Sequence, residues 1–320
     1  MNLEGLKMYI ENLFNERIII ISDIHLGDKN CNKEQFEIFL NQILNQEINC
    51  DRFIIVGDCF DMWRRDSVGV MIENAEIIDK FIQIEENKDI KLHFVVGNHD
   101  YYLRNLKQHD YPFQFAEEEL VLNESIGGET YEYRFCHGYK FDMNELKFIF
   151  DFFCISDDNL GEFYSDFWRV FRIITKKCLF NPICIYKTLN SAKEKWKKAE
   201  DRFGKHITVL DNQSNIIIDH PYKRGNFPPT EKRALNYAKQ NLNLNNRLFL
   251  VFGHTHKPFI YKDQDDLNER INLANTGSWV EEDFGNKTLI PNTFIELFQG
   301  TFKLYTFLGG EAIEIVYYSP

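Results

Sequence analysis

Residues 248–258, with the sequence LFLVFGHTHKP, form an apolar run that ends in His254 and His256. A short run of Leu, Val and Phe is typical of a strand that is buried on both faces. The histidines follow at its C-terminal end, and in open α/β sheets that edge is where ligands bind. The stretch therefore predicts a buried strand that delivers imidazoles to a binding site.

Other apolar runs end in the same way, on Asp, Asn or His. They are residues 18–25 (IIIISDIH), 53–61 (FIIVGDCFD), 92–100 (LHFVVGNHD) and 134–138 (RFCHG). One strand that ends in a histidine is common, but five that end in metal-ligand residue types indicate a shared site. Because the carboxyl ends of parallel strands meet at one edge of a sheet, we expect these side chains to lie close together.

The composition describes an ordinary globular protein with an acidic balance. Of 320 residues, 44% are hydrophobic and 27% charged, and the formal net charge is -12. This charge argues against nucleic acid as the main partner, because phosphate backbones would repel the molecule. Seven cysteines without paired short-range spacing are typical of buried thiols in a reduced compartment. With no signal peptide or membrane-spanning stretch in the sequence, we expect a cytoplasmic location.

The order of expected elements predicts an α/β core. Strands at 18–22, 53–56 and 92–96 alternate with helices at 33–46 and about 70–84, which is typical of a largely parallel sheet. Residues 113–122 and 131–136 predict an antiparallel hairpin. The C-terminal part predicts strands at 248–252 and 271–274, followed by three antiparallel strands at 294–298, 303–307 and 312–317.

Between residues 139 and 245 the strand and helix alternation disappears, and the pattern predicts helices at 143–153, 163–180 and 189–203. We therefore expect a core made of residues 1–138 and 246–320, with residues 139–245 as a helical insertion, or cap. The insertion is rich in aromatic and basic residues, among them Arg169, Arg172, Lys176 and Lys177. These predict either a surface for phosphates and lipid or only a solvated helix face.

The residue types at the strand ends predict a metal site. Asp23 and His25 are two residues apart, so in an extended segment their side chains share a face. Mixed oxygen and nitrogen ligands suit Mn, Fe or Zn better than Ca or Cu(I).

In order and type, these blocks resemble the calcineurin-like metallophosphoesterase superfamily, whose pattern is DxH, GDxxD, GNH[DE], a single His and GHxH. The resemblance implies a four-layer α/β/β/α sandwich of two mixed sheets, with the helical cap added. It also implies two divalent metal ions, of which Mn is the first candidate, before Fe or Zn. Asp23, His25 and His256 would hold the first, Asn98, His137 and His254 the second, and Asp58 would bridge both.

The same resemblance implies hydrolysis of a phosphoester or diphosphate bond by a metal-bridging hydroxide. His99 would act on the substrate as a catalytic residue, and Asp100 would orient His99. From the residues alone, Asp61 and Asp100 are equally compatible with turn residues that bond their own backbone.

Within the superfamily, the segments DIHLGD, GDCFDMWRRD, GNHDYYL and GHTHKP are most similar to the UDP-2,3-diacylglucosamine pyrophosphatase group. The similarity implies a nucleotide-diphospho-lipid substrate, met at an anionic membrane surface. Arg169, Arg172, Lys176, Lys177 and Asn275 are the expected substrate contacts. Two features depart from that group: some of its members have Arg at the position of His99, and Tyr139 replaces an acidic residue.

Three alternatives stay open at this point. The chain could be a general phosphodiesterase or phosphatase, a nuclease of the same superfamily, or a non-catalytic metal-binding scaffold. The branch of protein serine/threonine phosphatases is disfavoured, because the arginine that it needs for phosphate is replaced by Met62.

Overall fold

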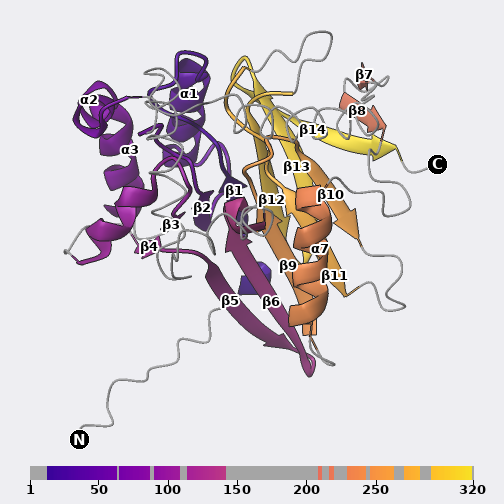
Figure 1. Ribbon diagram of the computed structural model, residues 1–320. Helices are drawn as coiled ribbons and strands as arrows, with labels where there is room; N and C mark the ends of the chain where they lie inside the picture. Colours follow the sequence, from indigo (N-terminus) through magenta and orange to yellow (C-terminus); the bar gives the residue numbers. More distant parts are fainter. Residues whose placement is uncertain are drawn as a thin grey trace, which may run out of the picture.

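The computed structural model describes residues 13–62, 65–86, 90–108, 114–141, 208–210, 216–219, 229–242, 246–262, 270–281 and 290–318. Two mixed sheets run through these residues (Figure 1). The nine-stranded sheet has the order β4 (Gln114–Ala116), β3 (Lys91–Val95), β2 (Arg52–Val56), β1 (Ile18–Ile21), β12 (Thr293–Phe298), β13 (Thr301–Leu308), β14 (Glu311–Tyr318), β8 (Ile216–Asp219) and β7 (Thr208–Leu210).

The five-stranded sheet has the order β10 (Phe259–Lys262), β11 (Ile271–Asn275), β9 (Asn246–Phe252), β6 (Glu129–Cys136) and β5 (Leu120–Ile126). Strands β6, β9 and β11 are parallel neighbours. In the first sheet β1 to β4 are also parallel, whereas β12, β13 and β14 are antiparallel. Both sheets therefore contribute parallel strands whose carboxyl ends can form one site.

Side-chain alternation along the strands explains why the sheets stack. Ile18 and Ile20 of β1 pack with Phe249 and Val251 of β9 in a core between the two sheets. Ile19 and Ile21 point to the opposite face, where helices α1 (Lys33–Leu44) and α3 (Ala75–Glu86) cover them. Burial of an aliphatic side chain contributes about 1.5–3 kcal/mol, so each face needs a partner layer.

The outer face of the second sheet is covered by α7 (Pro229–Asn241), which packs Ala234 and Ala238 on Leu248 and Leu250. Figure 1 shows α7 on β9 and β11, on the side of the molecule opposite α1 and α3. The described residues thus form the expected four layers of helix, sheet, sheet and helix. Three short elements complete the set in the part of the chain that the structure describes: η1 (Leu13–Asn15), α2 (Ser67–Glu73) and η2 (Tyr101–Gln108).

Two of the expected elements are divided in the structure. The helix expected over 70–84 breaks at Asn74, which is buried and donates from its amide to the Val70 carbonyl at 2.8 Å, so α2 ends and α3 begins there. The strand expected over 113–122 is split between the two sheets, with β4 beside β3 and β5 beside β6.

The range 139–245, expected to be helical, is described only in part. Within it, β8 pairs with β14 and extends the nine-stranded sheet, and α7 belongs to the layer over the second sheet. Short runs rich in β-branched residues, at 208–210 and 216–219, form strands that the sequence pattern does not predict. The three expected helices at 143–203 lie outside the described residues, and the division into core and cap stays a prediction. In the described ranges, no helix is both long and apolar enough to cross a membrane.

Candidate metal centre

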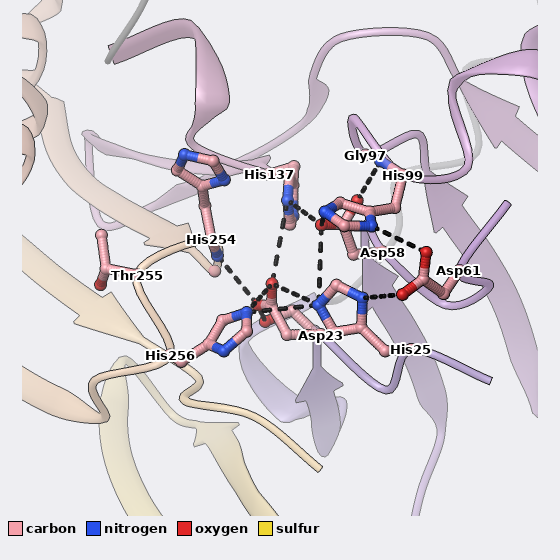
Figure 2. A network of polar contacts seen from close by, with 12 residues as sticks. Asp23, His25, Asp58, Asp61, Gly97, His99, His137, His254, Thr255 and His256 are labelled. Atoms are coloured by element: carbon pink, nitrogen blue, oxygen red, sulfur yellow. Dashed lines mark hydrogen bonds and ion pairs between the residues drawn. The ribbon is translucent and has the colours of Figure 1, made fainter. Parts of the chain in front are cut away.

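Five loops converge at one edge of the molecule, each directly after a parallel strand. The loops follow β1, β2 and β3 of the nine-stranded sheet and β6 and β9 of the five-stranded sheet. Figure 2 shows the imidazoles and carboxylates of these loops pointing toward one another. Residues expected from the sequence to share a site therefore do so, although more than 200 positions separate His25 from His256.

The first group consists of Asp23, His25 and His256. The Oδ1 atom of Asp23 lies 3.2 Å from His256 Nε2 and 3.8 Å from His25 Nε2. The two Nε2 atoms of His25 and His256 are 3.3 Å apart. These ligand-type atoms face a common point, as three protein ligands of one ion would.

The second group consists of Asp58, His137 and His254. His137 Nε2 lies 3.0 Å from Asp58 Oδ2. The same Asp58 oxygen is 3.8 Å from His25 Nε2, so Asp58 lies between the two groups. Asn98 follows Gly97 in the loop after β3 and is buried.

His99 joins a third group, with His25 and Asp58. Its Nε2 lies 4.0 Å from Asp58 Oδ2, and its ring meets the His25 ring edge-on with centroids 4.6 Å apart. The other ring nitrogen, Nδ1, lies 3.1 Å from Asp61 Oδ1 (Figure 2). The imidazole therefore has its Nε2 toward the two ligand groups and its Nδ1 on a buried carboxylate.

The structure corrects the role expected for Asp100. This carboxylate does not contact the His99 ring; it accepts backbone N–H groups from Cys59 at 2.7 Å and Gly97 at 2.8 Å. Asp61, which the sequence left open as a turn residue, is the carboxylate that orients His99. The two aspartates come at similar places in their motifs, so residue type alone did not distinguish them.

The backbone of the ligand loops is strained. Asp23, His25, Asp58, His254 and His256 all adopt positive φ, between 52° and 71°. Non-glycine residues avoid this region at a cost of about 1–3 kcal/mol each, and such residues concentrate at functional sites. The left-handed conformation turns each side chain out of the strand direction toward the centre.

Glycines leave the space that these side chains fill. A Cβ atom at Gly57 would come 2.5 Å from the His137 ring, and one at Gly97 would come 2.2 Å from Asp58 Oδ1. Contacts this short do not occur between real atoms, so any side chain here would displace a ligand. The glycines that precede Asp58 and Asn98 in the sequence are thus required by close approach.

Burial and neighbouring charges shift the pKa values of the side chains in the site. Burial raises the pKa of Asp58, but the positive potential of His137 and His99 outweighs it and holds the pKa well below its usual range. Burial lowers the pKa of His137, whereas Asp58 and Asp23 raise it, to about 9. For His25, burial and the neighbouring His99 lower the pKa to about 3, which leaves a neutral imidazole suited to bind a cation.

The profile of calcineurin-like phosphoesterases matches residues 16–258, a range that contains every loop described above. The chain belongs to the calcineurin-like phosphoesterase family. This confirms the family resemblance, the sandwich of mixed sheets and the expected class of metal-dependent phosphoester hydrolases.

This phosphoesterase is similar in sequence to three other proteins, over different shares of their length. It is 32% identical to the UDP-2,3-diacylglucosamine hydrolase of Blochmanniella floridana, over 82% of this chain and 89% of that protein. It is 25% identical to the protein of the same name from Psychromonas ingrahamii, over 33% of this chain and 42% of that one. It is 24% identical to the phosphate acetyltransferase of Buchnera aphidicola, over 67% of this chain but only 31% of that protein.

The donor atoms of this phosphoesterase fit divalent cations. His137 donates from Nδ1 to the Val56 carbonyl at 2.8 Å, so its Nε2 carries a lone pair unless the ring is charged. In the charged ring a proton on Nε2 forms an ion pair with Asp58 Oδ2 at 3.0 Å, and a metal ion bound between these two atoms would take the place of that proton. Among the described residues, Asp23 Oδ1, Asn98 Oδ1 and His137 Nε2 are buried without a hydrogen-bond partner.

Of the expected substrate contacts, only Asn275 lies among the described residues. Asn275 is fully buried, and its amide donates to the Gly253 carbonyl at 2.8 Å and to Thr255 Oγ1 at 3.2 Å. Its Oδ1 accepts from the Gly277 N–H, so Asn275 braces the loop of His254 and His256 from behind instead of facing a substrate. Arg169, Arg172, Lys176 and Lys177 lie outside the described residues.

Proposed function

We propose that this phosphoesterase hydrolyses a phosphoester or diphosphate bond with two divalent metal ions. Asp23, His25 and His256 would hold one ion, and Asn98, His137 and His254 the other, with Asp58 shared. The observation that carries the proposal is the convergence of three groups of ligand-type atoms, each within 4.8 Å of one another, in which His25 and Asp58 are shared between neighbouring groups. The mixed donor set is compatible with Mn, Fe or Zn.

When bound, a pair of such ions lowers the pKa of water to near neutrality and stabilises the charge on a phosphoryl group. The loops contribute rigidity: each carboxylate ligand is held by the backbone N–H of a histidine in another loop. His99 N–H donates to Asp58 Oδ1 and His254 N–H donates to Asp23 Oδ2, both at 2.8 Å. The ligand oxygens therefore keep their places without relying on the ions.

His99 would act on the substrate directly. Asp61 fixes a proton on Nδ1, so a second proton on the charged ring is carried by Nε2, the nitrogen that faces the centre. From there it can hydrogen-bond a phosphoryl oxygen or protonate the leaving oxygen. The side chain is 12% exposed, unlike the fully buried Asp61, and so remains accessible to a ligand.

For the substrate, we propose a nucleotide-diphospho-lipid of the UDP-2,3-diacylglucosamine type. Two relatives carry that compound in their names, and one of them aligns with most of this chain. The aromatic and basic residues of 139–245 have the chemistry to bind acyl chains and phosphates, and to meet an anionic membrane surface.

The test is a comparison of substrates with the manganese-loaded full-length protein. UDP-2,3-diacylglucosamine, an aryl phosphodiester, an aryl phosphomonoester and duplex DNA would be offered at equal concentration. We expect the diphosphate to be cleaved fastest, seen in ³¹P spectra as two monophosphates replacing the coupled diphosphate signals. Faster cleavage of the aryl esters would indicate a general phosphatase or phosphodiesterase, and salt-sensitive cleavage of DNA a nuclease. No turnover of any substrate, despite bound metal, would indicate a scaffold.

A further inference from the structure

The two oxygens of the Asp23 carboxylate have different environments. Oδ2 accepts two hydrogen bonds, one from the Ser22 hydroxyl and one from the His254 N–H. Oδ1 has no hydrogen-bond partner among the described residues and faces His256 Nε2 at 3.2 Å and His137 Nε2 at 3.8 Å. One oxygen is therefore engaged by the protein, and the other points at the imidazoles of both ligand groups.

The Ser22 hydroxyl is itself held in one orientation. A serine hydroxyl has a single hydrogen, and its acceptors are the nearby Asp23 Oδ2 and, at 3.3 Å, the Gly277 carbonyl. The charged carboxylate is the closer and stronger acceptor, and the contact with Thr276 Oγ1 therefore needs Thr276 as the donor. Thr276 is fixed in turn, because its carbonyl accepts from Thr293 Oγ1 at 2.6 Å. All three side chains are buried, and the hydrogen bonds of such a chain strengthen one another.

The loop of His254 closes tightly over this hydrogen bond. A Cβ atom at Gly253 would lie 2.2 Å from Ser22 Oγ and 2.3 Å from Asp23 Oδ2. Only glycine at this position lets the loop and the hydroxyl reach the same carboxylate oxygen. Because Gly253 has no side chain, the Ser22 hydroxyl and the N–H of His254 can both donate to Asp23 Oδ2.

We propose that Ser22 is a positioning residue, which fixes Asp23 so that Oδ1 alone is presented to a metal ion. This rests on the metal-dependent function proposed above. A carboxylate can bind a cation through one or both oxygens, and rotation about its last bond exchanges them. Without the hydroxyl, Asp23 loses one of the two donors that oppose this rotation. Loss of such a partner costs about 10- to 100-fold in metal affinity.

The experiment is a calorimetric titration of metal-depleted full-length protein with Mn²⁺. We expect the wild type to bind two ions, and Ser22→Ala to bind one of the two about 10- to 100-fold more weakly. Ser22→Thr retains the hydroxyl and is expected to restore most of the affinity. Thr306→Val is the matched control: its buried hydroxyl donates to the Pro291 carbonyl at 2.8 Å, away from Asp23, and the variant should bind both ions like the wild type.

Circular dichroism of each metal-depleted variant separates folding from positioning. Should Ser22→Ala not fold, Thr276→Val takes its place, since it removes only the donor to Ser22 and is expected to weaken the same site. Wild-type affinity for both ions in the folded variant would overturn the role of Ser22, and so would equal weakening in Thr306→Val. A wild type that binds no Mn²⁺ and turns over no substrate would instead overturn the proposed function.

Discussion

The loops at residues 57–61 and 97–100 resemble each other in sequence and differ in what their last residue does. Both begin with a glycine that makes room for a ligand, and both end in a buried aspartate. Asp61 contacts the ring of His99, whereas Asp100 collects backbone N–H groups of both loops. A buried carboxylate in such a motif can therefore either orient a catalytic side chain or hold the loop backbone, and only its contacts in the folded protein distinguish the two roles.

The largest expected effect is that of Asp58→Ala, which removes the carboxylate between the two ligand groups. We expect turnover of an aryl phosphodiester to fall to background, together with loss of at least one bound Mn²⁺ per chain in a metal analysis. His137 Nε2 would also lose the oxygen that it faces. Activity equal to that of the wild type would contradict the binuclear mechanism.

Replacement of His99 by alanine tests the residue that Asp61 orients. We expect kcat to fall by about 10² to 10⁴, the usual contribution of one general acid or base. The bound manganese should stay at two ions, because His99 is not among the seven proposed ligands. Steady-state kinetics and metal analysis on the same preparation measure both; loss of metal would make His99 a ligand.

Asp61→Asn sharpens the comparison between the two loops. We expect kcat to fall by about 10- to 100-fold, since the amide is a weaker acceptor for His99 Nδ1 and can also turn its N–H toward the ring. In a His99→Ala background the same substitution should change little, because the two residues act as one unit. Additive losses in the double variant would show that Asp61 acts elsewhere.

Asp100→Asn is expected to have the smallest effect on rate and a clear effect on stability. An amide nitrogen in place of one oxygen would leave the N–H of Cys59 or Gly97 without an acceptor, at a cost of about 1–3 kcal/mol in the free energy of unfolding. Urea unfolding measures this loss, with kcat of the metal-loaded enzyme as the counterpart. A fall in kcat as large as that of Asp61→Asn, without destabilisation, would reverse the two roles.

The sequence sufficed for much of the site because ligand types and strand patterns are local. Five apolar runs that end in Asp, Asn or His placed the residues of the metal centre at one edge, and the alternating strands and helices indicated the mixed sheets. The sequence could not distinguish Asp61 from Asp100, because their roles depend on where loops from different strands meet. Asn275 was misjudged for the same reason: only the packed fold shows that its amide turns back onto Gly253.

The fold was least predictable where tertiary contacts overrule local pattern. Nothing in the run from residue 113 to 122 marks the point where the chain leaves β3 for the second sheet. The strand at Ile216–Asp219 begins with three isoleucines in the range expected to be a helical insertion, and it gains its partner from β14, far along the chain. In both places the hydrogen bonds of a distant strand select the conformation.

The centre draws its side chains from both halves of the sandwich: β1, β2 and β3 belong to one sheet, and β6 and β9 to the other. A pair of ions held there would link the loops of one sheet to those of the other, at the edge where the parallel strands end. Chelation should therefore loosen the molecule from that edge inward, with faster hydrogen exchange at the tips of β6 and β9 and slow exchange retained beneath α1.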